Sequence, residues 1–132
     1  MPKYILNRKI DIQPLLSARK VLHNIIKDAE NEYEYMGAVQ AFEICYELAW
    51  KTCQKILTFQ GKEAYSPKDV FRKAYLEGII VDFDAWIEYL KTRNLTVHTY
   101  NEDTLYYVWH ALPEFLKDLD LLIKKIKMYV KK

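Results

Sequence analysis

The chain has 132 residues, with 20 basic and 18 acidic side chains and a formal net charge of +2 at pH 7. A charge this small excludes nucleic-acid binding by the field of the whole protein, so any such binding must come from a local cluster of cations. Only three glycines and four prolines interrupt a sequence dominated by Leu, Ile, Lys, Glu and Tyr, which favours long helices over a β-rich fold. The length fits one domain, which we expect to span residues 1–132.

The cysteines and the N-terminus indicate a soluble, cytoplasmic protein. Cys45 and Cys53 have no neighbouring Cys or His at ligand spacing, so neither a zinc site nor a disulfide framework is indicated, and both are expected to be buried thiols. The first residues lack the apolar core of a signal peptide, and no stretch approaches the ~18 apolar residues of a membrane span. We expect no membrane association, no metal and no cofactor.

Apolar residues at steps of three and four predict two long helices in the first half of the chain. The first is expected over residues 13–35 and the second over residues 36–60, where Gly61 ends it. Ser66 and Pro67 then form a strong helix start, because serine caps free amides and proline suits the first helical position. A short third helix is expected to run to about Glu77.

The second half of the chain predicts two more helices. A fourth opens at Asp82 and continues toward Tyr100, and Asn101 resembles a cap for a last helix that reaches Val130. Pro113 is expected to kink this last helix, because proline removes a backbone hydrogen bond. The loops are too short for long crossovers, so the predicted fold class is all-α, an up-and-down helical bundle of four main helices plus a short one.

Lysines gather at the C-terminal end of the last helix. They are Lys124, Lys125, Lys127, Lys131 and Lys132. We interpret this basic end first as a solvated face, favourable at the negative end of a helix dipole. A phosphate-binding role is the alternative.

The segment from Arg93 to Tyr100 concentrates the most usable chemistry in the chain. It reads Arg93-Asn94-Leu95-Thr96-Val97-His98-Thr99-Tyr100 and so combines a permanent cation, an amide, an imidazole and a phenol. An imidazole can take or give a proton near neutral pH, and a guanidinium binds phosphate bidentately. RNA carries its own nucleophile, the 2′-hydroxyl, so His98 could move its proton while Arg93 stabilises the charge on phosphorus. Such a scheme requires no metal.

The spacing within this segment leaves its assembly open. Asn94 and His98 are one helical turn apart and share a face, whereas Arg93 is offset from His98 by roughly 140° on an ideal helix. The helix could unwind near His98, Arg93 could reach across with its long side chain, or two copies of the segment could meet across a dimer axis. The third arrangement would gather two arginines and two histidines in one cleft.

A structural interpretation competes with the catalytic one. An Arg, a His and a Tyr near a helix end are more often a capping and packing group than a catalytic one. His23 and His110 are weaker candidates, because each is isolated on a helical segment. The eleven tyrosines favour a large amphipathic interface, so we expect self-association.

Several segments, in order along the chain, resemble the nucleotidyltransferase substrate-binding proteins of the HEPN superfamily. They are Phe42-Glu43, Tyr46-Glu47-Leu48-Ala49-Trp50-Lys51, Gly61, Ser66-Pro67-Lys68-Asp69-Val70, Arg72-Lys73-Ala74-Tyr75, Gly78-Ile79-Ile80, Trp86, and the run from Arg93 to Glu102. Their co-occurrence is a specific signal, whereas Arg-x4-His alone would be a weak one.

The resemblance implies a HEPN-like helical bundle that forms a homodimer, with the Arg-x4-His-x-Tyr segments of both subunits lining a shared cleft. In the toxin branch of the superfamily this cleft is a metal-independent ribonuclease site of a toxin–antitoxin module, which maps onto Arg93 and His98, with Asn94 as a supporting group. A partner minimal nucleotidyltransferase, the antitoxin, would transfer AMP from ATP onto Tyr100. This AMPylation would block RNA entry and neutralise the cations.

The family name also implies a second role, in which the chain is a non-catalytic subunit that helps a minimal nucleotidyltransferase bind its substrate. The chain has no Gly-Ser plus Asp-x-Asp signature, so it is not expected to be the transferase itself. The same cationic cleft would then bind a nucleotide or a phosphorylated substrate without cutting it. Both roles use the same residues, so the sequence leaves them open.

Overall fold

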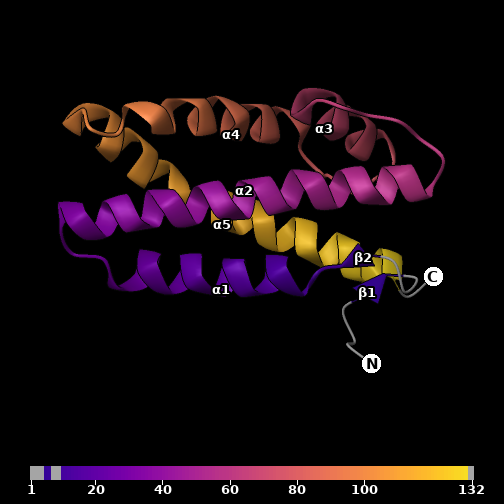
Figure 1. Ribbon diagram of the computed structural model, residues 1–132, viewed down its shortest axis with the longest axis horizontal. Coiled ribbons are helices and arrows are strands. Elements are labelled where there is room, and N and C mark those ends of the chain that lie inside the picture. Colours follow the sequence, from indigo (N-terminus) through magenta and orange to yellow (C-terminus); the bar gives the residue numbers. More distant parts are fainter. Residues whose placement is uncertain (1–4, 7–9, 131–132) are drawn as a thin grey trace.

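The computed structural model describes residues 5–6 and 10–130, and five α-helices account for most of them (Figure 1). The elements, in chain order, are β1 (Ile5–Leu6), β2 (Ile10–Asp11), α1 (Gln13–Asp28), α2 (Glu32–Phe59), α3 (Pro67–Leu76), α4 (Phe83–Leu95), the 3₁₀ turn η1 (Thr96–His98) and α5 (Glu102–Val130). The predicted all-α class is therefore confirmed. The small antiparallel pair of β1 and β2, with Leu6 opposite Ile10, was not predicted.

The helices lie roughly along one axis, and the two ends of the bundle differ (Figure 1). α1 and α2 run side by side in opposite directions, α3 and α4 follow one another along the other side of α2, and α5 crosses behind α2. The end of α4, η1 and the start of α5 share one end of the bundle, whereas β1, β2 and the end of α5 occupy the other. The Arg93–Tyr100 segment therefore lies at the end of the bundle opposite the small β-pair.

The predicted junction between the first two helices is wrong by several residues. α1 ends at Asp28 rather than near residue 35, and Ala29 adopts an extended backbone. Asn31 then starts α2, because its side-chain oxygen accepts a hydrogen bond of 3.0 Å from the Glu34 amide and its amide group donates to the Glu34 carboxylate at 2.6 Å. The apolar stripe continues across this junction, so periodicity alone did not reveal it.

The predicted boundaries of α3 are confirmed within about one residue. Ser66 accepts a hydrogen bond from the Asp69 amide, and Pro67 is the first helical residue. Gly61 and Gly78, which follow the ends of α2 and α3, have φ angles of +79° and +77°, a region that favours glycine.

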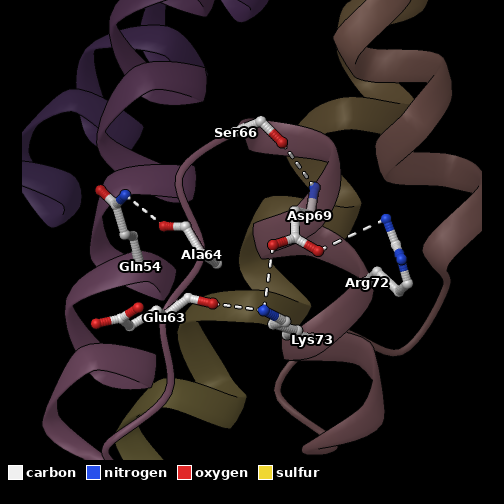
Figure 2. A network of polar contacts seen from close by, with 7 residues as sticks. All are labelled: Gln54, Glu63, Ala64, Ser66, Asp69, Arg72 and Lys73. Carbon is white, nitrogen blue, oxygen red and sulfur yellow. Dashed lines mark hydrogen bonds and ion pairs between the residues drawn. The ribbon is translucent and has the colours of Figure 1, made fainter.

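A polar network holds the loop before α3 against α2 (Figure 2). Gln54 of α2 donates to the backbone oxygen of Ala64 at 2.7 Å, and Lys73 of α3 donates to the backbone oxygen of Glu63. Asp69 forms ion pairs with Lys73 at 3.2 Å and Arg72 at 3.5 Å. The loop is therefore anchored to both of the helices that it joins.

The last two helices start where expected, but α4 ends early. α4 starts after Asp82, as predicted, but ends at Leu95 instead of continuing toward Tyr100. Asn101 caps α5, accepting a hydrogen bond of 2.9 Å from the Asp103 amide. Pro113 lies inside α5, which runs on to Val130, and the kink expected at Pro113 stays a prediction.

Aromatic side chains from four helices form the centre of the bundle. The Phe115 ring of α5 lies edge-on to Phe42 of α2, with 4.7 Å between ring centroids. It also contacts Trp86 and Tyr89 of α4 at 5.7 and 5.1 Å, and Trp86 in turn contacts Phe71 of α3 at 5.3 Å. Edge-to-face pairs at such distances add to the apolar area that each ring buries. This cluster joins α2, α3, α4 and α5.

The buried apolar side chains of all five α-helices belong to one hydrophobic cluster. Cys45 and Cys53 are both buried and unpaired within it, as predicted, and burial raises the pKa of each thiol to about 12. Such thiols stay protonated and unreactive at neutral pH. That the whole of residues 1–132 is one domain stays a prediction, which this single cluster supports.

Replacing Phe115 with alanine should remove the ring that links three helices. Phe115 is fully buried, so Phe115→Ala is expected to lower the free energy of unfolding by about 3–5 kcal/mol. Leu76→Ala is the matched control, because that side chain is 75% exposed and its loss should change stability by less than about 0.5 kcal/mol. Chemical denaturation measures both, and equal effects would contradict the central role of Phe115.

Candidate functional site

The candidate site is built where α4 gives way to the 3₁₀ turn. Thr96, which is 6% exposed, ends the α-helix: its hydroxyl donates a hydrogen bond of 2.7 Å to the backbone oxygen of Arg93. The turn then closes through a 3.0 Å bond from the Asn101 amide to the backbone oxygen of His98. A 3₁₀ turn rotates side chains differently from an α-helix, so the ideal-helix offset between Arg93 and His98 does not hold.

Arg93 is held between α4 and α2. Its Nη1 atom donates to the Thr96 hydroxyl at 3.0 Å and lies 3.3 Å from Oε2 of Glu43 on α2. The Arg93 side chain is 28% exposed and that of Glu43 is 33% exposed, so the pair lies at the edge of the core. A guanidinium carries five N–H donors, and both contacts use the same nitrogen. Arg93 is therefore oriented by the protein but keeps donors for a further anion.

Two polar atoms in and near Arg93 are buried without a hydrogen-bond partner among the described residues. They are Nε of Arg93 and the hydroxyl of Tyr46, whose pKa is affected by the charge of Arg93. Burial raises the pKa of Tyr46, the charge of Glu47 raises it further, and the positive charge of Arg93 opposes both effects. Tyr46 is thus a neutral neighbour of Arg93 and not an acid–base group at physiological pH.

His98 and Tyr100 are on the surface. Their rings meet edge to face, with 6.1 Å between centroids, and the Tyr100 side chain is 83% exposed. His98 is exposed as well, and Val97 beside it is 65% exposed. The imidazole and the phenol are therefore accessible to a large molecule such as RNA or a second protein.

The structure brings some of the predicted site residues together and leaves others apart. His98 contacts Tyr100, whereas the ion-pair and hydrogen-bond partners found for the Arg93 side chain among the described residues are Glu43 and Thr96. Asn94 is exposed in the last turn of α4, and its supporting role stays a prediction. Of the three arrangements considered, the unwinding of the helix near His98 is confirmed. This unwinding does not by itself bring the Arg93 guanidinium into contact with the His98 imidazole.

The sequence analysis did not predict two residues that hold Arg93 in the site, Glu43 and Thr96. Glu43 belongs to a motif segment that carries the family resemblance, but it lies 50 positions before Arg93, so no local spacing rule pairs them. Thr96 lies inside the segment itself. A threonine three residues after the arginine, near an expected helix end, was a local signal that its hydroxyl could bond back to the last turn.

Other candidate chemistry in the chain is sparse. His23 and His110 are exposed on α1 and α5, away from the segment in sequence. Among residues 5–6 and 10–130, no three His, Cys, Asp or Glu side chains are grouped so that they could hold a metal ion. In the same part of the chain no helix combines the length and apolarity needed to cross a membrane.

Known proteins share both the sequence pattern and the fold of this chain. Residues 11–128 match the family described as "Nucleotidyltransferase substrate binding protein like". A Haemophilus influenzae relative named "Probable ribonuclease HepT" is 32% identical over 96 residues. That match covers 69% of this chain and 66% of the relative, just under two thirds of its length.

Two solved structures have the same fold. A Thermus thermophilus protein superposes with a TM-score of 0.80 at 28% identity, over 85% of this chain and 98% of the other. A Haemophilus influenzae protein, described as revealing the fold of a substrate-binding domain of a nucleotidyltransferase, superposes with a TM-score of 0.81 at 26% identity, over 89% and 99% of the two chains. With the family match over residues 11–128, these likenesses show that the chain belongs to the nucleotidyltransferase substrate-binding protein family.

Proposed function

We propose that this protein is a toxin-type, metal-independent endoribonuclease of a toxin–antitoxin module, acting on RNA in the cytoplasm. The observation that carries the proposal is that one short segment holds both an oriented arginine and an accessible histidine: Glu43 and Thr96 hold Arg93, and His98 is exposed three residues past the helix end. The likeness to a protein named as a probable ribonuclease supports the same chemistry.

The reaction needs only a proton transfer and the stabilisation of charge. His98 takes the proton of a 2′-hydroxyl, whose oxygen attacks the adjacent phosphorus, and the bond to the 5′-oxygen breaks. The protonated His98 returns a proton to that leaving oxygen, so the products are a 2′,3′-cyclic phosphate and a 5′-hydroxyl. Arg93 binds the non-bridging oxygens, where negative charge grows, and Asn94 supports the phosphate from the same end of α4.

A second copy of the chain would complete this site. In one chain His98 and Tyr100 face solvent and Arg93 is not bonded to His98, so the groups lack an enclosing wall. A two-fold axis beside the segment would bring each Arg93 toward the histidine of the other copy and would cover apolar Val97, which is 65% exposed. We therefore infer a homodimer with a shared Arg-x4-His-x-Tyr cleft.

An accessory role is the second candidate. The family description refers to substrate binding, and the Haemophilus influenzae structure is described as a substrate-binding domain of a nucleotidyltransferase. In that role Arg93 and His98 would hold the phosphates of a nucleotide or of another substrate for a partner minimal nucleotidyltransferase, with no cleavage.

RNA cleavage in excess EDTA separates the two roles. The unmodified wild-type protein should cut a mixed RNA substrate, and His98→Ala should lower the rate roughly 10²–10⁴-fold, because it removes the general acid–base group. His110→Ala, which changes an exposed histidine on α5, should cut like wild type. Absence of cleavage by wild-type protein of confirmed unmodified mass would favour the accessory role.

Modification of Tyr100 tests the link to the partner. Incubation with the partner nucleotidyltransferase and ATP should add AMP to the protein, seen as a gain in intact mass, and the modified protein should lose RNA cleavage. Tyr100→Phe should not gain mass, whereas Tyr33→Phe, at a residue that is 86% exposed compared with 83% for Tyr100, should behave like wild type. A mass gain that persists in Tyr100→Phe would identify another acceptor.

Light scattering after size exclusion tests the homodimer. At micromolar concentration the particle should have twice the 15.8 kDa mass of one chain. Val97→Asp should weaken association at least tenfold, or about 1.4 kcal/mol, because it places a charge in the proposed interface. Val81→Asp, at a residue 56% exposed outside the segment, should leave the dimer intact. A wild-type monomer would exclude the shared cleft.

A further inference from the structure

A long hollow between α1 and α5 has no role in the site described above. Its larger part, of about 830 Å³, is lined by both helices and includes Arg19, Lys20, Lys124 and Lys127. A smaller part, of about 520 Å³, shares Arg19 and Lys124 and adds Lys117. Together they form one groove along the two helices, which we call the α1–α5 groove.

The α1–α5 groove is strongly cationic for a chain whose net charge is only +2. The basic side chains that line it are Arg19, Lys20, His23, Lys117, Lys124 and Lys127. Among the described residues that line it, Asp120 alone is acidic. With so small a net charge, nucleic-acid binding requires a local cluster of cations, and this groove provides one.

The Asp120 carboxylate in the groove is already neutralised. Nε and Nη2 of Arg19 donate to the two oxygens of Asp120 at 2.7 and 2.9 Å, a bidentate pair that joins the two walls of the groove. The pair fixes α1 against α5 and cancels its own charge. Lys20, Lys117 and Lys124 therefore set the sign of the potential that an approaching ligand meets.

The lining favours a chain of phosphates over a protein or a single nucleotide. Lysine is a compact point charge on a flexible stem and suits phosphate oxygens without a fixed geometry. Lys117 and Lys124 lie 15 and 22 residues after Glu102, or about 22 and 33 Å along α5 from the candidate site. One nucleotide cannot span that distance, but an RNA strand can contact both regions.

We propose that the α1–α5 groove binds the phosphate backbone of RNA as a second contact, separate from the residues that cut it. This inference depends on the proposed ribonuclease function only for the identity of the polyanion, RNA. Among the described residues that line the groove there is no Phe, Tyr or Trp on which bases could stack, so we expect binding there to depend on salt and little on sequence.

Binding without cleavage isolates the groove. In a His98→Ala background, the change in anisotropy of a labelled, unstructured RNA gives Kd over a range of salt concentrations. Lys20→Gln with Lys124→Gln, both exposed, should raise Kd at least tenfold and reduce the slope of log Kd against log salt by about 1.4, for two lost contacts to a single strand. Lys55→Gln with Lys68→Gln makes the same charge change at exposed positions outside the groove and should leave Kd within about twofold.

Two results would overturn the proposal. One is that both double variants lose RNA binding to the same extent, or that neither variant loses it. The other is unchanged RNA binding by the groove variant with loss of binding to the partner nucleotidyltransferase, which would make the groove a protein interface.

Cleavage assays of the same substitutions, made with His98 intact, keep this proposal distinct from the ribonuclease proposal. If the groove binds RNA but wild-type protein does not cut RNA, the RNA-binding proposal for the groove is supported and the ribonuclease proposal fails. If wild-type protein cuts RNA and the groove variant binds and cuts equally well, the groove proposal fails alone.

Discussion

The packing of Phe115 against α2 and α4 fixes the frame in which the candidate site is built. Its ring touches Phe42 of α2 and both Trp86 and Tyr89 of α4, so these helices cannot shift relative to one another without opening the core. Glu43 follows Phe42 on α2, and Arg93 lies one turn beyond Tyr89 on α4. The aromatic contacts thereby fix the distance between α2 and α4 at which the side chains of Glu43 and Arg93 form their ion pair.

That ion pair has opposing effects on the proposed chemistry. It orients a long, flexible side chain before any substrate arrives, which lowers the entropy lost when Arg93 binds a phosphate. It also places a carboxylate beside a group that must attract an anion. The partial exposure of both side chains lets solvent screen this carboxylate, and a phosphate can share the guanidinium because donors remain. Glu43 is thus a positioning residue, and its neighbour Phe42 links that position to the core.

The features that could be predicted from the sequence are those that depend on nearby residues. Ser66 with Pro67 marked the start of α3, and Gly61 and Gly78 marked helix ends, because caps and left-handed turns are local. The end of α1 was misplaced since the apolar stripe runs past Ala29. The pairing of Arg93 with Glu43, and the groove that α1 forms with α5, arise only from tertiary packing and have no local signal.

In the proposed reaction RNA supplies the nucleophile, His98 moves protons and Arg93 binds the phosphate, so the chemical ends of the cleaved RNA are the decisive measurement. This mechanism predicts fragments with a 2′,3′-cyclic phosphate or its 3′-phosphate product on one side and a 5′-hydroxyl on the other. It also predicts no cleavage where a single 2′-deoxy nucleotide precedes the cut. Fragments bearing 5′-phosphates, or cleavage at the deoxy position, would show that water or another group attacks phosphorus and would contradict the mechanism.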